Sequence, residues 1–229
     1  MNIVRKIYPH LACIVLMCVL VACGDHNVTE FGFDGSFAGT LKDESGNVVP
    51  GDITSGALVV KALGEGDAVS TDMRVKGDGT YQNTKLYPKK YKVWVTGPIA
   101  LVTDTLIVDF AKQKHVNQDL VVSPFITIGK PSVAGSPSST SAEVSFQMTP
   151  GDGKVVSKRE LYCSTNPFPN ASTGSGAFYD TKKVTLNANS GTATIADLAP
   201  HTKYYIRVGA QATGANGYNY SEQIEIETP

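Results

Sequence analysis

Apolar and polar positions alternate with a period of two through most of the chain beyond residue 30. In residues 90–97, for example, one face of the expected strand carries Tyr91, Val93 and Val95, and the other carries Lys92, Trp94 and Thr96. Such segments are short and are separated by clusters of Gly, Asp, Asn, Ser and Pro, which is typical of β-sandwiches. No window beyond the N-terminus has the 3.6-residue period of an amphipathic helix. The pattern predicts an all-β protein with two β-sandwich domains in tandem.

The first sandwich is expected over residues 31–122. Polar turn clusters such as Lys42–Asn47 and Gly77–Gly79 separate its extended segments. The expected segments are Phe33–Leu41, Ala57–Leu63, Ser70–Lys76, Thr80–Leu86, Lys90–Gly97, Thr103–Phe110 and Val116–Val122.

The second sandwich is expected over residues 125–229. Val122-Ser123-Pro124 is interpreted as a hinge, because proline removes a ladder donor and restricts the residue before it. The expected segments are Phe125–Ile128, Ala142–Phe146, Ser157–Cys163, Val184–Leu186, Thr192–Ile195 and Tyr204–Val208.

The N-terminus has the composition of a lipoprotein leader. Arg5 and Lys6 precede an apolar run, Leu11 to Ala22, that is shorter than the ~20 residues of a membrane-spanning helix. Leu20-Val21-Ala22-Cys23 resembles a lipobox, so residues 1–22 are predicted to be a signal peptide. A buried core helix and an ordinary secretory cleavage are the alternatives, and neither calls for a cysteine at this position.

Lipidation is therefore predicted at Cys23, with residues 23–30 as a tether. A protein is held firmly on a membrane when its cysteine carries two or more acyl chains. In enteric lipoproteins, Asp directly after the lipidated cysteine signals retention in the inner membrane. Gly24 occupies that position here, so we expect a lipid-anchored protein of the cell envelope, in the outer membrane, facing either the cell surface or the periplasm.

Several turn and core residues carry a resemblance to known sandwiches. The residues are Gly39-Thr40-Leu41-Lys42-Asp43 with Gly46 and Pro50, then Asp78-Gly79-Thr80-Tyr81, and Leu86-Tyr87-Pro88 before Tyr91. This set resembles the prealbumin-like or carboxypeptidase-regulatory-like sandwich. The glycine that usually follows the proline is Lys89 here, so that turn is expected to differ.

A narrower resemblance rests on Asp78-Gly79-Thr80-Tyr81 continuing to Asn83-Thr84-Lys85-Leu86, with Gly97-Pro98 later. It is similar to an uncharacterised family of two-domain lipoproteins of the Bacteroidetes. The resemblance implies a second β-domain after the first. It also implies genes that often lie beside starch-utilisation-type glycan uptake systems.

Leu198-Ala199-Pro200-His201-Thr202-Lys203-Tyr204 is the sharpest local motif of the second domain. It resembles the corner before strand F of fibronectin type III domains, where a tyrosine hydroxyl contacts an upstream backbone group. Tyr204 is the matching position. The motif indicates a fold and carries no chemistry.

Charge and cysteine content exclude some classes of function. Lys and Arg number 20 against 21 Asp and Glu, with no basic stripe of the kind that binds nucleic acid. After the leader, Cys163 is the only cysteine besides Cys23, so no internal disulfide is expected. Cys163 alternates with core positions and is interpreted as a buried, inert thiol rather than a nucleophile.

No catalytic or metal-binding motif is present. His26, His115 and His201 have no metal-ligand spacing, and Gly-x-Ser-x-Gly, His-Glu-x-x-His and phosphate-binding glycine loops are missing. Asp78-Gly79 is interpreted as a turn rather than a calcium loop. Paired carboxylates of a hydrolase could meet only in space. We therefore expect a non-enzyme without a cofactor or metal.

Aromatic residues outside the apolar phase of a strand, or in loop-like and turn-rich stretches, are the remaining candidates for ligand binding, because sugar rings stack on aromatic faces. Packing under a loop or at the domain interface is the competing interpretation for Trp94, and ordinary loop packing is the competing interpretation for the loop aromatics. The candidates are Trp94, Tyr162, Phe168, Tyr179, Tyr218 and Tyr220, with Phe178 in the same loop-like stretch as Tyr179.

Asp104-Thr105-Leu106 resembles the O-glycosylation site of exported Bacteroidetes proteins, which makes Thr105 a candidate for modification. Together these features favour a non-catalytic accessory of glycan binding or uptake, with a polysaccharide or an uptake complex as partner. The alternative is a structural or adhesive surface protein, such as a spacer or a fimbria-like subunit. Related anchored fimbrial subunits are cut after a basic residue near the anchor. The first basic residue after Gly24 is Lys42, which disfavours such a cleavage here.

Overall fold

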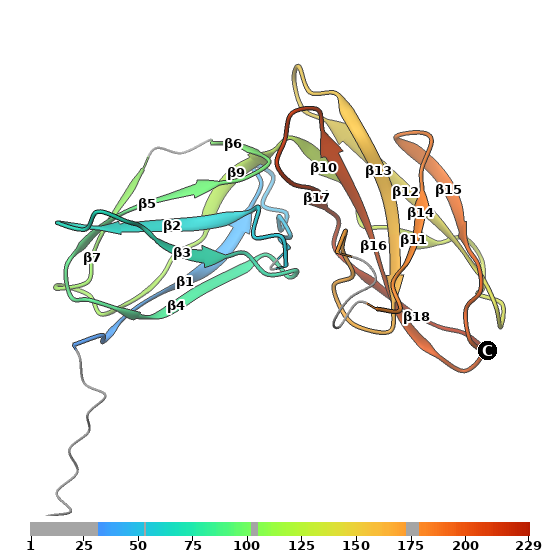
Figure 1. Cartoon of the computed structure of the whole chain (residues 1–229), viewed down its shortest axis with the longest axis horizontal. Helices are drawn as coiled ribbons and strands as arrows, with labels where there is room; N and C mark the ends of the chain where they lie inside the picture. Colours follow the sequence, from blue (N-terminus) through green and yellow to red (C-terminus); the bar gives the residue numbers. More distant parts are fainter. Residues whose placement is uncertain (1–31, 53, 102–104, 173–178) are drawn as a thin grey trace, which may run out of the picture. The chain divides into compact units, whose positions relative to one another are not determined.

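The computed structural model describes residues 32–52, 54–101, 105–172 and 179–229. Every regular element in these ranges is a β-strand, as the alternation predicts, and none of the described residues forms a helix that could span a bilayer. The predicted signal peptide, Cys23 and the tether lie outside the described residues. Asp34–Pro229 form one compact unit that contains two sandwiches in tandem (Figure 1).

The first sandwich has two sheets. One has the order β4-β1-β9-β6 with β8 also paired to β1, and the other has the order β3-β2-β5-β7. The strands are β1 (Gly35–Lys42), β2 (Val59–Gly64), β3 (Thr71–Arg74), β4 (Thr80–Leu86), β5 (Lys90–Thr96), β6 (Ile99–Leu101), β7 (Leu106–Asp109), β8 (His115–Asn117) and β9 (Leu120–Pro124).

Two features of this sandwich differ from the sequence-based expectation. Strand β6 was not expected, and the segment expected over 116–122 is divided into β8 and β9. Both pieces run parallel to β1. The division falls at Gln118, whose carbonyl accepts a hydrogen bond from the Tyr81 hydroxyl, and at Asp119, whose carboxylate accepts one from the Thr40 N–H. Those side-chain contacts replace ladder bonds at the break.

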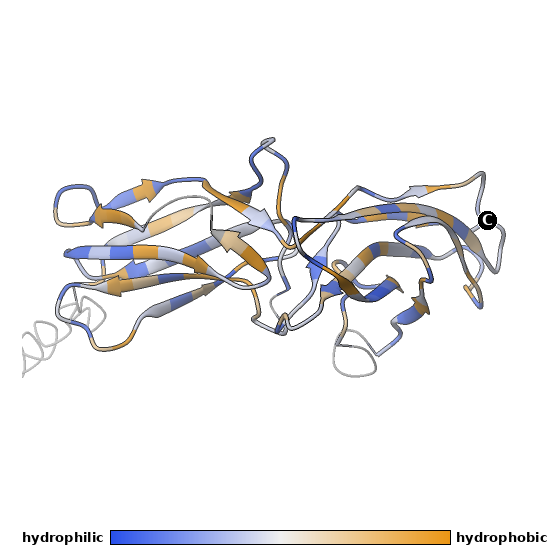
Figure 2. Cartoon of the chain, turned by 90° about the horizontal axis from the view of Figure 1, so that it is seen from above, coloured by the Kyte–Doolittle hydropathy of each residue, from blue (hydrophilic) through white to orange (hydrophobic). Residues whose placement is uncertain are grey.

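Aromatic rings meet at the centre of the first core. The rings of Phe37 and Tyr91 lie 6.2 and 5.5 Å from that of Phe110, both edge to face, and Tyr81 packs 5.5 Å from Phe37. This geometry is favourable for aromatic pairs. Hydrophobic and hydrophilic residues alternate along the strands (Figure 2), which sends one set into this core and the other outward.

The second sandwich also has two sheets. One has the order β10-β12-β11 with β15 on β12, and the other has the order β14-β13-β16-β17 with β18 on β16. The strands are β10 (Ile126–Ile128), β11 (Ser132–Val133), β12 (Ala142–Pro150), β13 (Val156–Ser164), β14 (Lys182–Thr185), β15 (Ser190–Ile195), β16 (Lys203–Ala212), β17 (Asn219–Tyr220) and β18 (Ile224–Glu227).

The Tyr204 hydroxyl accepts a hydrogen bond from the backbone N–H of Ala199 at 2.9 Å. This contact ties the start of β16 to the chain five residues upstream. Cys163 is buried in the core beneath it, together with Leu161 and Ile206. The alternation therefore places these residues as expected, whereas the short strands β11, β17 and β18 were not expected.

The passage between the two sandwiches is short and hydrogen-bonded. Pro124 ends β9 opposite Ile99 of β6, and β10 begins two residues later at Ile126. The N–H of Phe125, between them, donates to the carbonyl of Pro98 at 2.9 Å. The segment interpreted as a hinge is thus paired on the first sandwich and continues directly into the second.

Side-chain hydrogen bonds join the sandwiches further. Asn219 Nδ2 donates to the Pro98 carbonyl at 3.0 Å, and the Tyr220 hydroxyl donates to Asp52 Oδ2 at 3.1 Å. Arg207 Nη2 donates to the carbonyl of Gly51 at 3.2 Å. The donors in all three bonds are buried, so the junction is a built interface rather than a loose linker.

Candidate functional site

The outer face of the β3-β2-β5-β7 sheet carries the only tryptophan. Trp94 lies directly opposite Lys61 on β2, and Lys92, two residues before it on β5, lies opposite Ile107 on β7. Residues opposite one another in register share a face of the sheet. Trp94 is half-buried, whereas Ile107 is 57% exposed. We call Lys61, Leu63, Lys92, Trp94 and Ile107 the Trp94 face.

Polar and charged side chains surround Trp94. Lys61 Nζ lies 2.8 Å from both carboxylate oxygens of Asp72 on β3. This hydrogen bond lowers the pKa of Asp72 from its ordinary value, against a smaller effect of burial. Thr96 continues the face on one side of the tryptophan and Lys92 on the other. The neighbouring positions on this face, along β5 and across to β2, therefore carry two lysines and a threonine hydroxyl.

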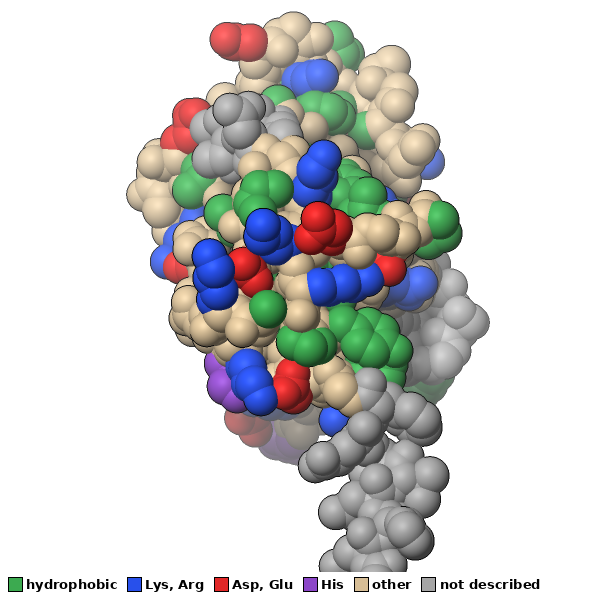
Figure 3. Space-filling model, turned by 90° about the vertical axis from the view of Figure 1, so that its left-hand side faces the viewer, with side chains coloured by type: hydrophobic (Ala, Val, Ile, Leu, Met, Phe, Trp, Pro, Cys, Tyr) green, Lys and Arg blue, Asp and Glu red, His purple; other side chains and the backbone are tan. Residues whose placement is uncertain are grey.

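The same face ends in a hollow of about 330 Å³. It is bounded by Leu63, Lys92 and Ile107 of the Trp94 face and by the turn 64–67. Lys89, from the turn before β5, forms a 2.5 Å ion pair with Asp67 and lies 5.8 Å from the Tyr91 ring centroid. Figure 3, which faces the side drawn at the left of Figure 1, shows basic, acidic and hydrophobic side chains interspersed there.

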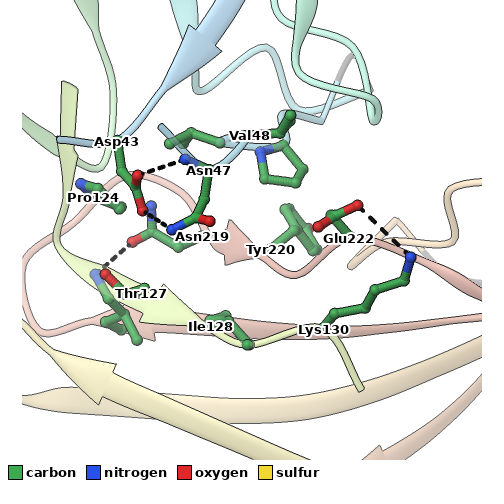
Figure 4. A pocket seen from close by; sticks show the side chains of 14 residues that line it. Asp43, Asn47, Val48, Pro124, Thr127, Ile128, Lys130, Asn219, Tyr220 and Glu222 are labelled. Carbon is green, nitrogen blue, oxygen red and sulfur yellow. Dashed lines mark hydrogen bonds and ion pairs between the residues drawn. The ribbon is translucent and has the colours of Figure 1, made fainter. Parts of the chain in front are cut away.

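A cleft of about 280 Å³ lies between the sandwiches (Figure 4). Its polar side chains are largely engaged within the protein. The Asp43 carboxylate accepts hydrogen bonds from the N–H and side-chain amide of Asn47, and Asn219 Oδ1 accepts one from the Ile126 N–H. Lys130 and Glu222 form a 3.8 Å ion pair at its edge. The cleft is thus organised mainly by contacts that position the junction.

The outer face of the β14-β13-β16-β17 sheet contradicts one prediction. Tyr162 lies on the face opposite Leu161 as expected, but it is fully buried, and Tyr220 is only 4% exposed. Their rings lie 6.2 Å apart, Tyr218 stacks 5.9 Å from Tyr220, and the Tyr162 hydroxyl donates to the Glu160 carboxylate. Tyr162 and Tyr220 are therefore internal packing residues and cannot stack a ligand from the surface.

Burial and Glu160 also shift the ionisation of this cluster. Burial, and then the hydrogen bond with Glu160, raise the pKa of Tyr218 to about 12. The pKa of Tyr162 is raised further for the same two reasons. Lys183 lies 3.3 Å from Glu160 and balances its charge. The tyrosines remain neutral donors at any physiological pH.

The other predicted residues are scattered. Tyr218 is half-buried over Tyr220, and Tyr179 is 74% exposed at the end of a loop. Thr105 is exposed immediately before β7, accessible as a modification site requires, whereas Asp104 lies outside the described residues. Phe178 and Cys23 also lie outside them. The structure does not gather these positions around Trp94.

Phe168 does belong to a cluster, at the junction. It is half-buried with a φ of 58°, and its N–H donates to Gln223 Oε1 at 2.7 Å. The Arg207 guanidinium lies 6.0 Å from its ring and 4.4 Å from that of Tyr220. A Cβ at Gly77 of the first sandwich would overlap the Phe168 ring, so this aromatic packs directly against the neighbouring sandwich.

Sequence reasoning missed Arg207. Its place in Tyr205-Ile206-Arg207-Val208 suggests an outward, solvated side chain, yet it is fully buried. Nε donates to the Ser221 carbonyl at 3.1 Å and Nη2 to that of Gly51. Burial lowers its pKa to about 10, which still leaves the guanidinium charged at neutral pH. No local pattern marks this residue, because the segments that cover it are distant in the chain.

The described residues offer little for catalysis. Among them, no group of three or more His, Cys, Asp or Glu side chains could hold a metal ion. Ser36 Oγ and His115 Nδ1 lie 2.8 Å apart, but these residues are exposed register partners on β1 and β8. Burial raises the pKa of Cys163 to about 12, so its thiol is protonated and unreactive at neutral pH.

Comparison with known proteins places the fold. No family model matches the chain, and no curated protein matches it. A DUF3823 family protein from Parabacteroides merdae ATCC 43184 superposes with a TM-score of 0.67 at 18% identity, over 84% of this chain and 98% of that one. A DUF3823 family protein from Bacteroides ovatus ATCC 8483 gives 0.68 at 18%, over 85% and 100%.

A candidate carbohydrate binding protein from Bacteroides uniformis ATCC 8492 gives a TM-score of 0.64 at 18% identity, over 86% of this chain and 100% of that one. These three structural neighbours are proteins of the Bacteroidetes that superpose over both sandwiches, and the resemblance noted in the sequence is confirmed as a likeness of fold. At this identity the likeness establishes the fold alone.

Proposed function

We propose that this chain is a lipid-anchored, non-catalytic protein of the cell envelope that serves as an accessory of glycan binding or uptake. The observation that carries the proposal is the Trp94 face. It combines a half-buried indole with flanking lysines and a threonine on the outer face of a sheet.

The chemistry of sugars suits such a face. One side of a sugar ring is lined with C–H groups that pack on an aromatic plane, while its hydroxyls need donors and acceptors nearby. Trp94 supplies the plane, and Lys61, Lys92 and Thr96 supply polar atoms around it. A sheet holds these side chains in place before binding, which lowers the entropic cost of association.

Two further points support the proposal. The chain begins with a lipoprotein-like leader and Cys23, which would keep the sandwiches at a membrane surface where polymers are captured. One structural neighbour bears the description of a candidate carbohydrate binding protein. A glycan-uptake complex is the partner we propose, by the resemblance to lipoproteins of that setting.

The test is a panel of neutral and acidic polysaccharides titrated against the purified chain by calorimetry. Trp94→Ala should weaken binding of the recognised polymer by about tenfold or more, because it deletes the stacking plane. Tyr179→Ala is the matched control, since it removes an exposed aromatic elsewhere. Absence of binding to every polymer, or equal affinity of Trp94→Ala and the parent chain, would contradict glycan recognition at this face.

The anchor is tested separately. Cys23→Ala should lose its acyl chains and leave the membrane fraction, because one cysteine carries all of the predicted lipid. Mass spectrometry of the parent chain should show the acyl groups on Cys23. If the parent chain shows no lipid mass, Cys23 is not an anchor, and the polysaccharide binding test is unaffected.

A further inference from the structure

A second cavity, of about 240 Å³, lies at the junction on the Arg207 side. Both sandwiches contribute to its lining. The side chains that matter are those of Asp52, Lys76, Asp78, Phe168, Asn170 and Arg207. The cavity is separate from the Trp94 face, with which it shares no residue.

Arg207 is incompletely satisfied beside this cavity. Its Nε and Nη2 donate to backbone carbonyls, but Nη1 is buried and has no hydrogen-bond partner. A buried donor of a charged group without an acceptor is costly, by several times the net value of an ordinary hydrogen bond. If Arg207 served only to join the sandwiches, its remaining donors would be expected to meet carbonyls as the other two do.

Phe168 is held in an unfavourable backbone conformation at the same place. A φ of 58° lies in the left-handed region, which bulky residues seldom adopt. Its N–H is fixed by Gln223, and both its ring and Arg207 line the cavity, with the guanidinium 6.0 Å from the ring centroid. Strain of this kind collects where a side chain must be presented to a ligand.

We propose that this cavity is a binding site for the carboxylate of an acidic sugar, a hexuronate unit, with Arg207 as the residue that receives the carboxylate. A guanidinium fork matches a carboxylate in shape and charge better than it matches a hydroxyl. The Phe168 ring packs on the sugar face. Because Nη1 is enclosed, the ring moves off the guanidinium when the ligand enters.

The neighbouring charges favour a hexuronate over other anions. Asp52 and Asp78 would repel a dianion such as phosphate more strongly than a monoanion. Asp52 Oδ2 already accepts a hydrogen bond from the Tyr220 hydroxyl, and Asp78 Oδ1 accepts two from Thr80, so only the remaining lone pairs of these carboxylates serve sugar hydroxyls. Lys76 offsets part of their charge. A ligand with one negative charge, several hydroxyls and an apolar ring face therefore fits all the lining groups, whereas a simple inorganic anion fits only Arg207.

The probe pair is D-glucuronate and D-glucose, which differ only at C6. Binding to the full chain is measured by saturation-transfer NMR and by shifts of the Gly77 and Asn170 amides. We expect glucuronate to bind and to shift both amides, and glucose to bind at least about tenfold more weakly. No binding of glucuronate at millimolar concentration, or equal binding of glucose, would overturn the proposal.

Arg207→Lys keeps the charge and removes the fork, and should weaken glucuronate binding by about tenfold or more. Arg159→Lys is the matched control, because Arg159 lies on the adjacent strand β13 and donates to Asn189 outside the cavity. Trp94→Ala should bind glucuronate normally. If Trp94→Ala lost glucuronate binding while Arg207→Lys kept it, the sugar would bind at the Trp94 face. That result would contradict the Arg207 site and leave the proposed function standing.

If Arg207→Lys fails to fold, the wild-type amide shifts decide the matter. Shifts at Gly77 and Asn170 support the site, and shifts confined to Lys92 and Trp94 contradict it. Failure of the polysaccharide panel leaves this test unchanged, since it uses a monosaccharide and a different set of residues.

Discussion

The outer faces of two sheets, one in each sandwich, carry an aromatic residue in the same kind of position but differ in exposure. Trp94 on β5 and Tyr162 on β13 both lie on the polar phase of an alternating strand. Trp94 is half-buried beside exposed Lys92 and Ile107, whereas Tyr162 is fully buried. The alternation that places the two residues is the same.

The difference comes from what covers each face. Tyr162 is covered by Tyr218 and Tyr220, which arrive from the β16–β17 connection and β17. Arg207 on the same sheet is covered by Phe168 and by the first sandwich. Phase along a strand decides the face, and distant segments decide whether that face is free. The predictions below test this contrast.

The largest effect is expected for Tyr162→Ala compared with Trp94→Ala. Removing the enclosed tyrosine leaves a cavity and deprives Glu160 of one of its hydrogen-bond donors, and should lower the free energy of unfolding by about 3–5 kcal/mol. Trp94→Ala should cost less, about 1–2 kcal/mol, because the indole lies on the outer face of the sheet and is only partly buried. Urea denaturation measures both. If Trp94→Ala lost more stability than Tyr162→Ala, Trp94 rather than Tyr162 would be the enclosed residue.

Gly77→Ala should lower stability by about 1–3 kcal/mol, since its methyl group would overlap the Phe168 ring. Gly129→Ala is the control, because a Cβ there meets only the Gln147 carbonyl at 3.7 Å. Thermal unfolding of the two variants compares them directly. Equal stability would mean that Phe168 does not pack on the first sandwich, and the covering of Arg207 would need another explanation.

Tyr220→Phe removes the hydroxyl that donates to Asp52 and accepts from the Ala171 N–H. We expect a loss of about 1–2 kcal/mol, because both partners are left without it in a buried setting. Tyr179→Phe, at an exposed position, serves as the control and should change stability by no more than a few tenths. A neutral Tyr220→Phe would imply that the junction hydrogen bond is not formed in solution.

The smallest effect belongs to the ion pair on the open face. Lys61→Ala should cost at most about 0.5 kcal/mol, because the pair is partly exposed to solvent, which screens it. The lowered pKa of Asp72 means that the pair stabilises the fold above the unfolded pKa of an aspartate, and that this is lost as pH falls through the lowered folded pKa. Stability of wild type and Lys61→Ala should therefore converge in acid. A gap that persists there would point to packing rather than charge.

Local patterns predicted much of the fold. The strands Thr80–Leu86 and Lys90–Thr96 follow the alternation closely, and Tyr204 makes the backbone contact with Ala199 that the corner motif implies. These features depend on residues close in sequence, so they could be read without the rest of the chain. The short strand β17 could not, because two residues pair with β16 only where the connection brings them.

The candidate sites divide in the same way. The phase of Trp94 along β5 correctly predicts that it lies on an outer face. No described segment covers this face enough to bury the indole fully. Tyr162 has the same phase as Trp94, and Tyr220 lies in a turn-rich stretch, yet both are buried packing residues. Arg207 has no local signal, since its acceptor Gly51 lies in the other sandwich.

The sequence by itself determined the all-β class, the two tandem sandwiches, the resemblance of the leader to a lipoprotein signal and the absence of a catalytic motif. Each of these depends on composition or on spacing along a short stretch. Only the tertiary structure decided which sheet face stays open and which residues meet at the junction. The physical reason is that burial depends on the summed contacts of segments such as 51–52, 167–172 and 219–221, which lie far apart in the chain and meet only when both sandwiches have folded.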